Sequence, residues 1–257
     1  MGEITPVFVC GMGRSGTTNA LRILNTHSSV MLNGEIALNV LMRFFDLLDA
    51  TDQSYGTKEH ISEDWNARKA EYIFESFGYL SKSGRGRYDN ATGARFRGHK
   101  TPRLETIFEK YESHLSGCGP APRYFYCMRN PFDCWRSYRT MPWTGYSEVE
   151  DFLQGYLESF ERLEQMQKKL DERLILLNLD ALKKTPDIFE FYNKNIFTPL
   201  GLDMPERTVK RITKIMGDRK PSSTPELSAQ DREVIASEPG IANVLETYFP
   251  NSISASR

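Results

Sequence analysis

Residues 11 to 18 have the types and spacing to bind an anion through the backbone. They read Gly-Met-Gly-Arg-Ser-Gly-Thr-Thr and directly follow the apolar run from Val7 to Cys10. The apolar run predicts a buried strand, and the segment that opens at Ala20 predicts a helix. Glycines let the turn between them expose its N–H groups beside the positive end of that helix. The segment therefore predicts a backbone nest for an anionic group.

The residue at position 17 indicates which anion this turn suits. Nucleoside triphosphatases with the same glycine spacing carry a lysine there, which reaches the β- and γ-phosphates, and the next hydroxyl holds magnesium. Here Thr17 replaces the lysine and Thr18 follows it. The turn is therefore poorly suited to ATP. On this segment alone, a glycine-rich turn without a ligand remains the alternative.

A second candidate anion site lies about 110 residues further along the chain. The strand-like run 123–128 ends at Arg129, and Asn130-Pro131 then opens a helix as N-cap and first helical residue. Ser137 follows eight residues after Arg129. A guanidinium presents a rigid fork of donors to a phosphate, and a nearby hydroxyl can complete the cradle. Taken alone, the segment also fits a capped helix with a surface arginine.

Together the two segments resemble the sulfotransferases that use 3′-phosphoadenosine 5′-phosphosulfate (PAPS), and the first is closest to the tyrosylprotein and carbohydrate branch. The resemblance implies a P-loop-like fold, PAPS as co-substrate, no metal, a hydroxyl-bearing acceptor and adenosine 3′,5′-bisphosphate as product. It implies that Arg129 and Ser137 bind the 3′-phosphate. It also implies that the phosphosulfate is held by the loop residues Gly13, Arg14, Ser15, Gly16, Thr17 and Thr18.

The resemblance also implies which residues do the chemistry, an in-line displacement. In the tyrosylprotein branch a glutamate at the distance of Glu35 after the loop is the general base, and the loop arginine, here Arg14, stabilises charge. Lys100 stands in a Lys-x-Pro context and is expected to reach the sulfuryl group. Without the resemblance, Glu35 is a helix-start carboxylate and Lys100 one more charge on a basic loop. His99 is the reserve base, although it is expected to point to the opposite face from Lys100.

The positions of these residues depend on a predicted α/β fold. Strands alternating with helices predict a single domain over residues 1–257, with a central parallel sheet flanked by helices. Ligands on such sheets bind at the carboxyl ends of the strands, where both turns lie. Asp180 is expected to cap a helix, residues 51–64 to form a polar loop, and residues 82–97 to form a mobile basic loop of unassigned role. Strands are expected at residues 7–10, 30–32, 96–100, 123–128 and 174–177.

Composition excludes several other classes of protein. The 257 residues include 33 basic and 34 acidic side chains, so the net charge of −1 argues against broad binding to nucleic acid. No segment has the length of a membrane span, and no signal-peptide pattern is present, so we expect a cytoplasmic protein unless an anchor has been removed. A disulfide framework or a metal site is not expected from the four cysteines, Cys10, Cys118, Cys127 and Cys134, because none forms a C-x-x-C pair.

Two functional alternatives remain at this point. A P-loop kinase-like phosphotransferase would turn over magnesium-ATP and would be expected to carry the lysine that is missing at position 17. A non-catalytic nucleotide-binding module would bind the bisphosphate without consuming PAPS. The sequence does not identify the acceptor, which fits a small molecule, a carbohydrate or a tyrosyl group, and it does not fix the oligomeric state.

Overall fold

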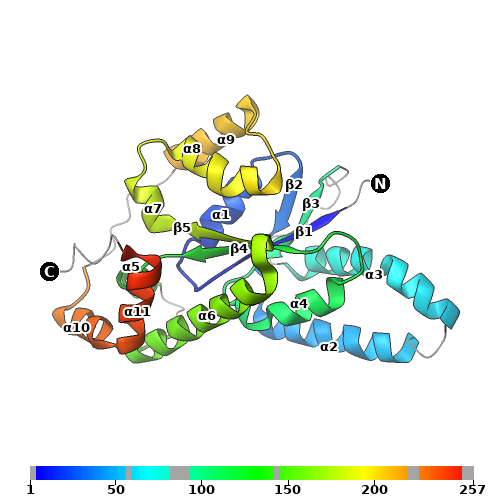
Figure 1. Cartoon of the computed structure of the whole chain (residues 1–257), viewed down its shortest axis with the longest axis horizontal. Coiled ribbons are helices and arrows are strands. Elements are labelled where there is room, and N and C mark those ends of the chain that lie inside the picture. Colours follow the sequence, from blue (N-terminus) through cyan, green and yellow to red (C-terminus); the bar gives the residue numbers. More distant parts are fainter. Residues whose placement is uncertain (1–3, 56–58, 82–92, 142–144, 219–225, 251–257) are drawn as a thin grey trace.

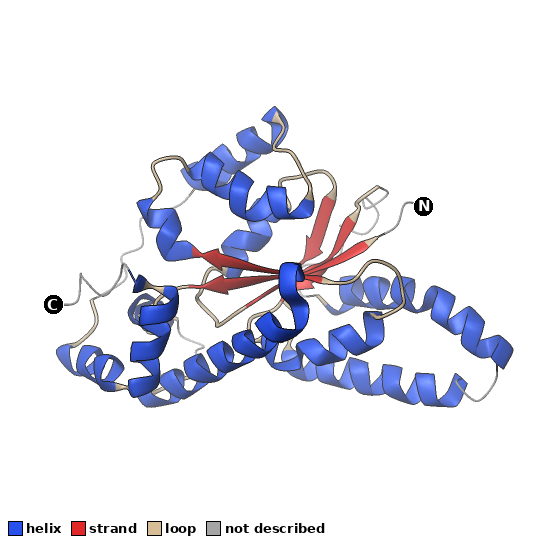
Figure 2. Cartoon of the chain, viewed as in Figure 1, coloured by secondary structure: helices blue, strands red, loops and turns tan. Residues whose placement is uncertain are grey.

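The computed structural model describes residues 4–55, 59–81, 93–141, 145–218 and 226–250. These residues form a five-stranded sheet between two layers of helices (Figure 1, Figure 2). The strand order is β2-β3-β1-β4-β5 and every neighbouring pair is parallel. The predicted fold class is therefore confirmed. The strands are β1 (Thr5–Cys10), β2 (Val30–Asn33), β3 (Phe96–Lys100), β4 (Arg123–Met128) and β5 (Leu174–Asn178).

The helices divide between the two faces of the sheet (Figure 2). The upper face in the figures carries α1 (Thr17–Leu24), α7 (Leu179–Lys184), α8 (Ile188–Tyr192) and α9 (Glu206–Gly217), with the short turns η4 (Asn193–Phe197) and η5 (Thr198–Leu200). The lower face carries α2 (Leu38–Tyr55), α3 (Glu59–Leu80), α4 (Phe108–Leu115), α5 (Pro131–Tyr138), α6 (Val149–Leu170), α10 (Ala229–Ser237) and α11 (Pro239–Tyr248). The 3₁₀ turns η2 (Leu104–Ile107) and η3 (Asp171–Arg173) precede α4 and β5.

Strand β1 lies at the centre of the sheet and shows how the core is divided. Phe8 and Cys10 join the apolar cluster on one face, and Val7 and Val9 join the cluster on the other, all without exposed surface. A strand that is buried on both faces has apolar residues at successive positions. This is why the segment does not alternate between apolar and polar residues. In register, Val9 lies opposite Lys100 of β3. The turn after β1 therefore leaves the sheet between the ends of β3 and β4.

The expected loop over residues 51–64 is wrong for the described residues. Helix α2 continues to Tyr55 and α3 begins at Glu59. Asp52 of α2 accepts hydrogen bonds from Trp65 Nε1 and Lys69 Nζ of α3, both at 2.6 Å. Asp52, one of the polar residues that suggested a loop, thus joins α2 to α3. Residues 82–92, most of the basic stretch 82–97, lie outside the described residues.

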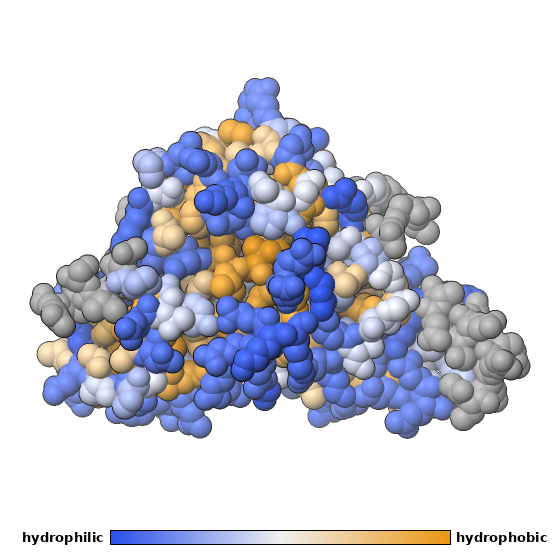
Figure 3. All heavy atoms as spheres, in the orientation of Figure 1, coloured by the Kyte–Doolittle hydropathy of each residue, from blue (hydrophilic) through white to orange (hydrophobic). Residues whose placement is uncertain are grey.

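The face of the molecule in Figure 3 is mostly hydrophilic, and hydrophobic residues gather at its middle, between the upper and lower helices. No helix in the described ranges is both long enough and apolar enough to span a bilayer. Within the same ranges, no three His, Cys, Asp or Glu side chains are grouped so as to hold a metal ion.

Candidate active site

The glycine-rich turn after β1 includes backbone angles that suit the predicted anion nest. Gly11 and Gly16 have positive φ angles, 114° and 97°, which glycine adopts without steric cost. A Cβ at Gly11 would lie 2.2 Å from the carbonyl oxygen of Cys127, so the close contact with β4 also requires glycine. No side chain caps the first turn of α1, and the buried Ser15 hydroxyl has no hydrogen-bond partner among the described residues. Both features fit a phosphate or sulfate oxygen at this turn.

A buried carboxylate that the sequence analysis missed fixes the start of this turn. Glu105, in η2, is fully buried and accepts a hydrogen bond from the backbone N–H of Gly11 at 2.9 Å. The Arg103 N–H donates to the Gly11 carbonyl at 3.0 Å, so Gly11 is held on both sides. Burial raises the pKa of Glu105, and hydrogen bonds from Ser159 and Gly11 oppose that rise. A single acid among ordinary helix residues gave no sequence signal for this role.

The second turn, between β4 and α5, has the predicted cap. The Asn130 side chain accepts a hydrogen bond from the Asp133 N–H at 2.9 Å, and Pro131 is the first helical residue. The expected cap at Asp180 is wrong, because Asn178 caps α7 by accepting from the N–H groups of residues 180 and 181. Asp180 instead accepts from the backbone and side-chain nitrogens of Asn130, at 2.9 and 2.8 Å. It therefore holds the turn that carries Arg129.

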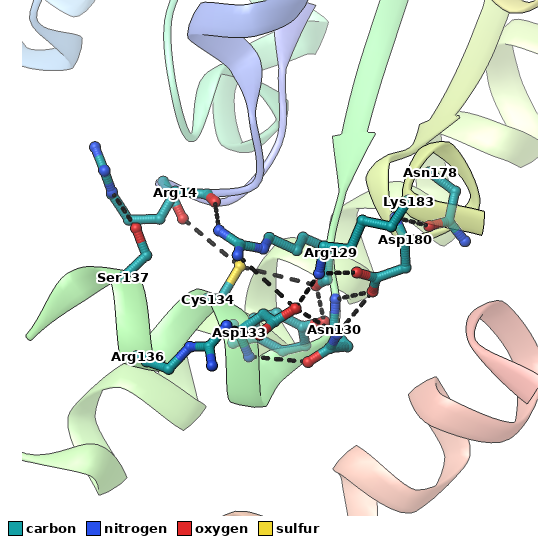
Figure 4. A network of polar contacts seen from close by, with 12 residues as sticks. Arg14, Arg129, Asn130, Asp133, Cys134, Arg136, Ser137, Asn178, Asp180 and Lys183 are labelled. Atoms are coloured by element: carbon teal, nitrogen blue, oxygen red, sulfur yellow. Dashed lines mark hydrogen bonds and ion pairs between the residues drawn. The ribbon is translucent and has the colours of Figure 1, made fainter. Parts of the chain in front are cut away.

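A basic cluster surrounds this turn, as Figure 4 shows. We define it as four cationic side chains and two carboxylates: Arg14, Arg129, Arg136, Lys183, Asp133 and Asp180. Asp133 is shared among Lys183, Arg136 at 2.7 Å and Arg129 at 3.8 Å. Burial alone would raise the pKa of Asp133, but the three cations hold it below its usual range. Arg129 therefore forms only a long ion pair with Asp133, which also pairs with two other cations. The buried Arg129 Nε has no hydrogen-bond partner among the described residues.

Arg14 and Ser137 connect the two turns directly. The Arg14 Nε donates to Ser137 Oγ at 3.0 Å, and Arg129 Nη1 donates to the Arg14 carbonyl at 3.4 Å (Figure 4). Three residues predicted from two separate motifs thus meet at one place. Thr17 is buried at the start of α1, while Thr18 beside it is exposed.

Glu35 and Lys100 form a second group of predicted residues. Lys100 Nζ lies 2.9 Å from Glu35 Oε2. The Lys100 side chain is 7% exposed and that of Glu35 is 47% exposed, so the carboxylate is open to an incoming molecule. Within the described part of the chain, no hydrogen bond or ion pair joins Arg14 to this pair. The structure therefore brings the predicted residues together in two groups, Arg14 with Arg129 and Ser137, and Glu35 with Lys100.

Thr101, which the sequence analysis did not single out, holds Glu35 next to Lys100. Its hydroxyl donates to the Ile36 carbonyl at 3.0 Å and accepts from the Ile36 N–H at 3.2 Å. Because Thr101 follows Lys100 and Ile36 follows Glu35, this double hydrogen bond ties Glu35, the predicted base, to the strand that carries the lysine. We therefore interpret Thr101 as a positioning residue for Glu35.

Thr101→Val should lower kcat roughly 10- to 100-fold with little change in the KM for PAPS, the predicted donor, because a small displacement of Glu35 misaligns the predicted base. The buried Ile36 groups would also lose their partner, at a cost of about 1–3 kcal/mol in the free energy of unfolding. Steady-state kinetics with urea unfolding test both effects. Thr101→Ser keeps the hydroxyl and should restore kcat. A valine variant that loses stability but keeps kcat would contradict the positioning role.

His99, the reserve base, lies on the opposite face of β3 from Lys100, as its place in the sequence predicted. It is fully buried against Phe8 and Phe77. Since Thr101 donates its only hydroxyl proton to Ile36, His99 Nδ1 carries a proton and donates to Thr101 at 3.1 Å. Its Nε2 then accepts from the Tyr111 hydroxyl at 2.8 Å. Burial lowers the pKa of His99 to about 3. With no exposed surface and both nitrogens paired, His99 is the weaker candidate for the base.

This buried histidine should make stability depend on pH. Unfolded His99 takes up a proton as the pH falls through about 6.5, whereas the folded side chain stays neutral down to about pH 3. The unfolded state therefore binds more protons in that window, and acid lowers the free energy of unfolding by up to about 1.4 kcal/mol per pH unit. Urea unfolding measured between about pH 7 and pH 5 gives the free energy of unfolding at each pH. This free energy should fall less steeply with decreasing pH for His99→Gln than for the wild type. Parallel slopes would contradict this.

Comparison with known proteins identifies the family. The sequence matches a sequence model described as the sulfotransferase family over residues 6–187. It matches no curated protein sequence. Among solved structures, sulfotransferase STF9 from Mycobacterium avium is similar with a TM-score of 0.55 and 15% identity, over 97% of this chain and 78% of that chain.

Two other solved structures are similar over nearly their whole length. The sulfotransferase domain from the curacin biosynthetic pathway has a TM-score of 0.53 and 13% identity, over 95% of this chain and 96% of that one. A sulfotransferase from Alicyclobacillus acidocaldarius has a TM-score of 0.50 and 12% identity, over 96% of each chain. These likenesses show the fold. The family match spans both turns and the Glu35–Lys100 pair, and the chain belongs to the sulfotransferase family.

Proposed function

We propose that the protein transfers a sulfuryl group from PAPS to an acceptor hydroxyl and releases adenosine 3′,5′-bisphosphate. The observation that carries this proposal is the hydrogen bond between Arg14 and Ser137, which joins the two candidate anion-binding turns at the carboxyl edge of one sheet. PAPS carries anionic groups at its 5′ and 3′ ends, so two joined turns suit it better than one. The family match supports the reaction class.

The residues at the two turns fit the two ends of this donor. The backbone of the first turn and the uncapped start of α1 supply N–H donors for the 5′-phosphosulfate. The side chains proposed to join them are Ser15, Thr17 and Thr18, with Gly13 and Gly16 supplying backbone. Arg129 and Ser137 are proposed to bind the 3′-phosphate, since Arg129 keeps a buried donor without a partner among the described residues.

Glu35 and Lys100 are proposed to carry the chemistry. As the acceptor oxygen bonds to sulfur, the bond from sulfur to the 5′-phosphate oxygen breaks, and the acceptor proton passes to Glu35. The ammonium of Lys100, 2.9 Å from Glu35, supplies positive charge against the sulfuryl oxygens and the leaving phosphate. The exposed Glu35 carboxylate suits the role of base, because the base must contact the acceptor hydroxyl. The Lys100 ammonium is proposed to stabilise charge and does not need to contact the acceptor, so it can be buried.

The experiment that tests this function is an acceptor screen with PAPS. The protein is incubated with PAPS and a phenol, a sugar, a simple alcohol or a tyrosyl peptide, and both products are followed by mass spectrometry. Release of adenosine 3′,5′-bisphosphate that depends on one acceptor class, with the sulfated acceptor, is the expected result. Turnover of magnesium-ATP instead would favour the kinase-like alternative. Tight bisphosphate binding with no turnover of any acceptor would favour the non-catalytic module.

A further inference from the structure

Asn33 has a buried polar atom that the fold does not use. It is the last residue of β2 and is 3% exposed, yet its side-chain carbonyl oxygen has no hydrogen-bond partner among the described residues. A buried oxygen without a partner destabilises a fold, because it has lost its hydrogen bonds to water. Buried polar groups in native proteins are nearly always paired, so this one requires an explanation. A hydrogen-bond donor on a bound molecule supplies one.

The side chain of Asn33 faces the helices on the lower side of the sheet, where α2 and α3 lie (Figure 1). Val30 and Leu32 belong to the core cluster on the other side, and side chains alternate along a strand. In register, Asn33 lies beside His99, whose ring packs against Phe77 of α3. Both nitrogens of that histidine are already paired, with Thr101 and Tyr111, so they do not satisfy the oxygen of Asn33.

The proposed base lies close to Asn33 along the chain. Glu35 follows two residues later, so the two Cα atoms are at most about 7 Å apart. Thr101 of the segment after β3 binds the backbone of Ile36, which keeps the chain around Glu35 beside β3. A hydrogen bond at each side chain spans about 2.8 Å, so hydroxyls on neighbouring carbons of one molecule can reach both. An acceptor whose reacting hydroxyl meets Glu35 can thus bring a second hydroxyl to Asn33.

The chemistry of the unpaired atom indicates what the second group must be. The atom is a carbonyl oxygen, which accepts a hydrogen bond and does not pair with an ether or another carbonyl. A site with a buried polar atom rejects a substrate that leaves this atom unpaired, whereas an apolar site discriminates weakly. A hydroxyl next to the reacting hydroxyl meets the requirement. Sugar rings and catechols both carry this arrangement, a vicinal diol.

We propose that Asn33 binds the second hydroxyl of a vicinal diol and so selects a diol as the acceptor. The second hydroxyl donates a hydrogen bond to Asn33 Oδ1, while the reacting hydroxyl loses its proton to Glu35. The proposal rests on the proposed function, because it assumes that Glu35 meets the acceptor. It names the class of acceptor for that reaction. Asn33 takes no part in the transfer itself and is a specificity-determining residue.

Two pairs of acceptors, each differing by one hydroxyl, test this preference. Catechol is compared with phenol, and 1,2-cyclohexanediol with cyclohexanol, by the release of adenosine 3′,5′-bisphosphate from PAPS. In at least one pair the diol should have a kcat/KM about 10- to 100-fold higher than the single alcohol. The pair that shows the preference distinguishes an aromatic acceptor from a sugar-like one.

Asn33→Leu isolates the contact, because leucine has nearly the same shape and no polar atom. It should lower kcat/KM for the preferred diol about 10- to 100-fold and change that for the matching single alcohol by less than about twofold. The midpoint of urea unfolding should stay equal or rise, because a buried oxygen without a partner has been removed. Asn243→Leu, at an exposed position of α11, is the matched control and should leave the acceptor preference unchanged.

Three results would overturn the assignment of Asn33. The first is equal kcat/KM within both acceptor pairs for the wild type. The others are an equal loss for diol and single alcohol in Asn33→Leu, and a lower urea midpoint, because each indicates a structural role. In all three cases the wild type still sulfates an acceptor, so the proposed function stands. A wild type that consumes no PAPS with any acceptor, here or in the acceptor screen, would instead remove both proposals.

Discussion

Glu35→Gln should lower kcat about 100- to 10,000-fold while leaving the affinity for adenosine 3′,5′-bisphosphate within about twofold of the wild type. Glutamine has the shape of glutamate and can still accept a hydrogen bond from Lys100, which lies 2.9 Å away in the wild type. It cannot take the proton of the acceptor hydroxyl. The loss is therefore expected in turnover and not in donor binding.

The measurement pairs single-turnover kinetics with calorimetry. Glu206→Gln is a suitable control, because Glu206 is 80% exposed and pairs with Lys210 on the outer surface of α9. It should leave both quantities unchanged. Loss of bisphosphate affinity in Glu35→Gln, with normal chemistry in a single turnover, would reverse the assignment and make Glu35 a donor-binding residue.

The parts of the fold that the sequence predicted correctly depend on local physical signals. The run Val7 to Cys10 is apolar because β1 is buried on both faces. Asn130 and Pro131 begin α5 because an N-cap and a proline at the first position satisfy the helix start from within the segment itself. Each signal involves residues that are neighbours along the chain.

The parts that the sequence missed depend on contacts between distant residues. Asp52 joins α2 to α3 through Trp65 and Lys69, and the loop prediction failed because those partners lie 13 and 17 residues away. Glu105 holds Gly11 across 94 residues, and Asp180 holds Asn130 across 50. Both acids serve the two predicted turns. The motifs identified the residues placed to meet the ligand, whereas the residues that hold the motifs carried no local pattern.

The direction of the Arg14 side chain also depends on a contact between residues that are distant in the sequence. The motif gives its position in the turn, but the choice between the side of Lys100 and the side of Ser137 depends on how β3 and β4 flank β1. The sequence predicted two anion sites, one at the first turn with Arg14 and one at the second turn with Arg129 and Ser137. The structure shows two groups, one at the end of β4 and one at the end of β3.

Arg129→Ala should weaken binding of adenosine 3′,5′-bisphosphate by about 1.5–3 kcal/mol, or roughly 10- to 150-fold in the dissociation constant. Its guanidinium is largely buried and keeps an Nε without a partner among the described residues, so a phosphate that it binds gains a desolvated, charge-assisted contact. Asp133 keeps Lys183 and Arg136 after the substitution, so the turn should not be left with an unpaired carboxylate.

Calorimetry of Arg129→Ala measures this loss, with Arg162→Ala as control, because Arg162 is a half-buried arginine of α6 that donates to Gln165. Arg129→Lys should fall between the wild type and alanine, because it keeps the charge but loses the fork of donors. Equal affinity in Arg129→Ala and the wild type would refute the 3′-phosphate site.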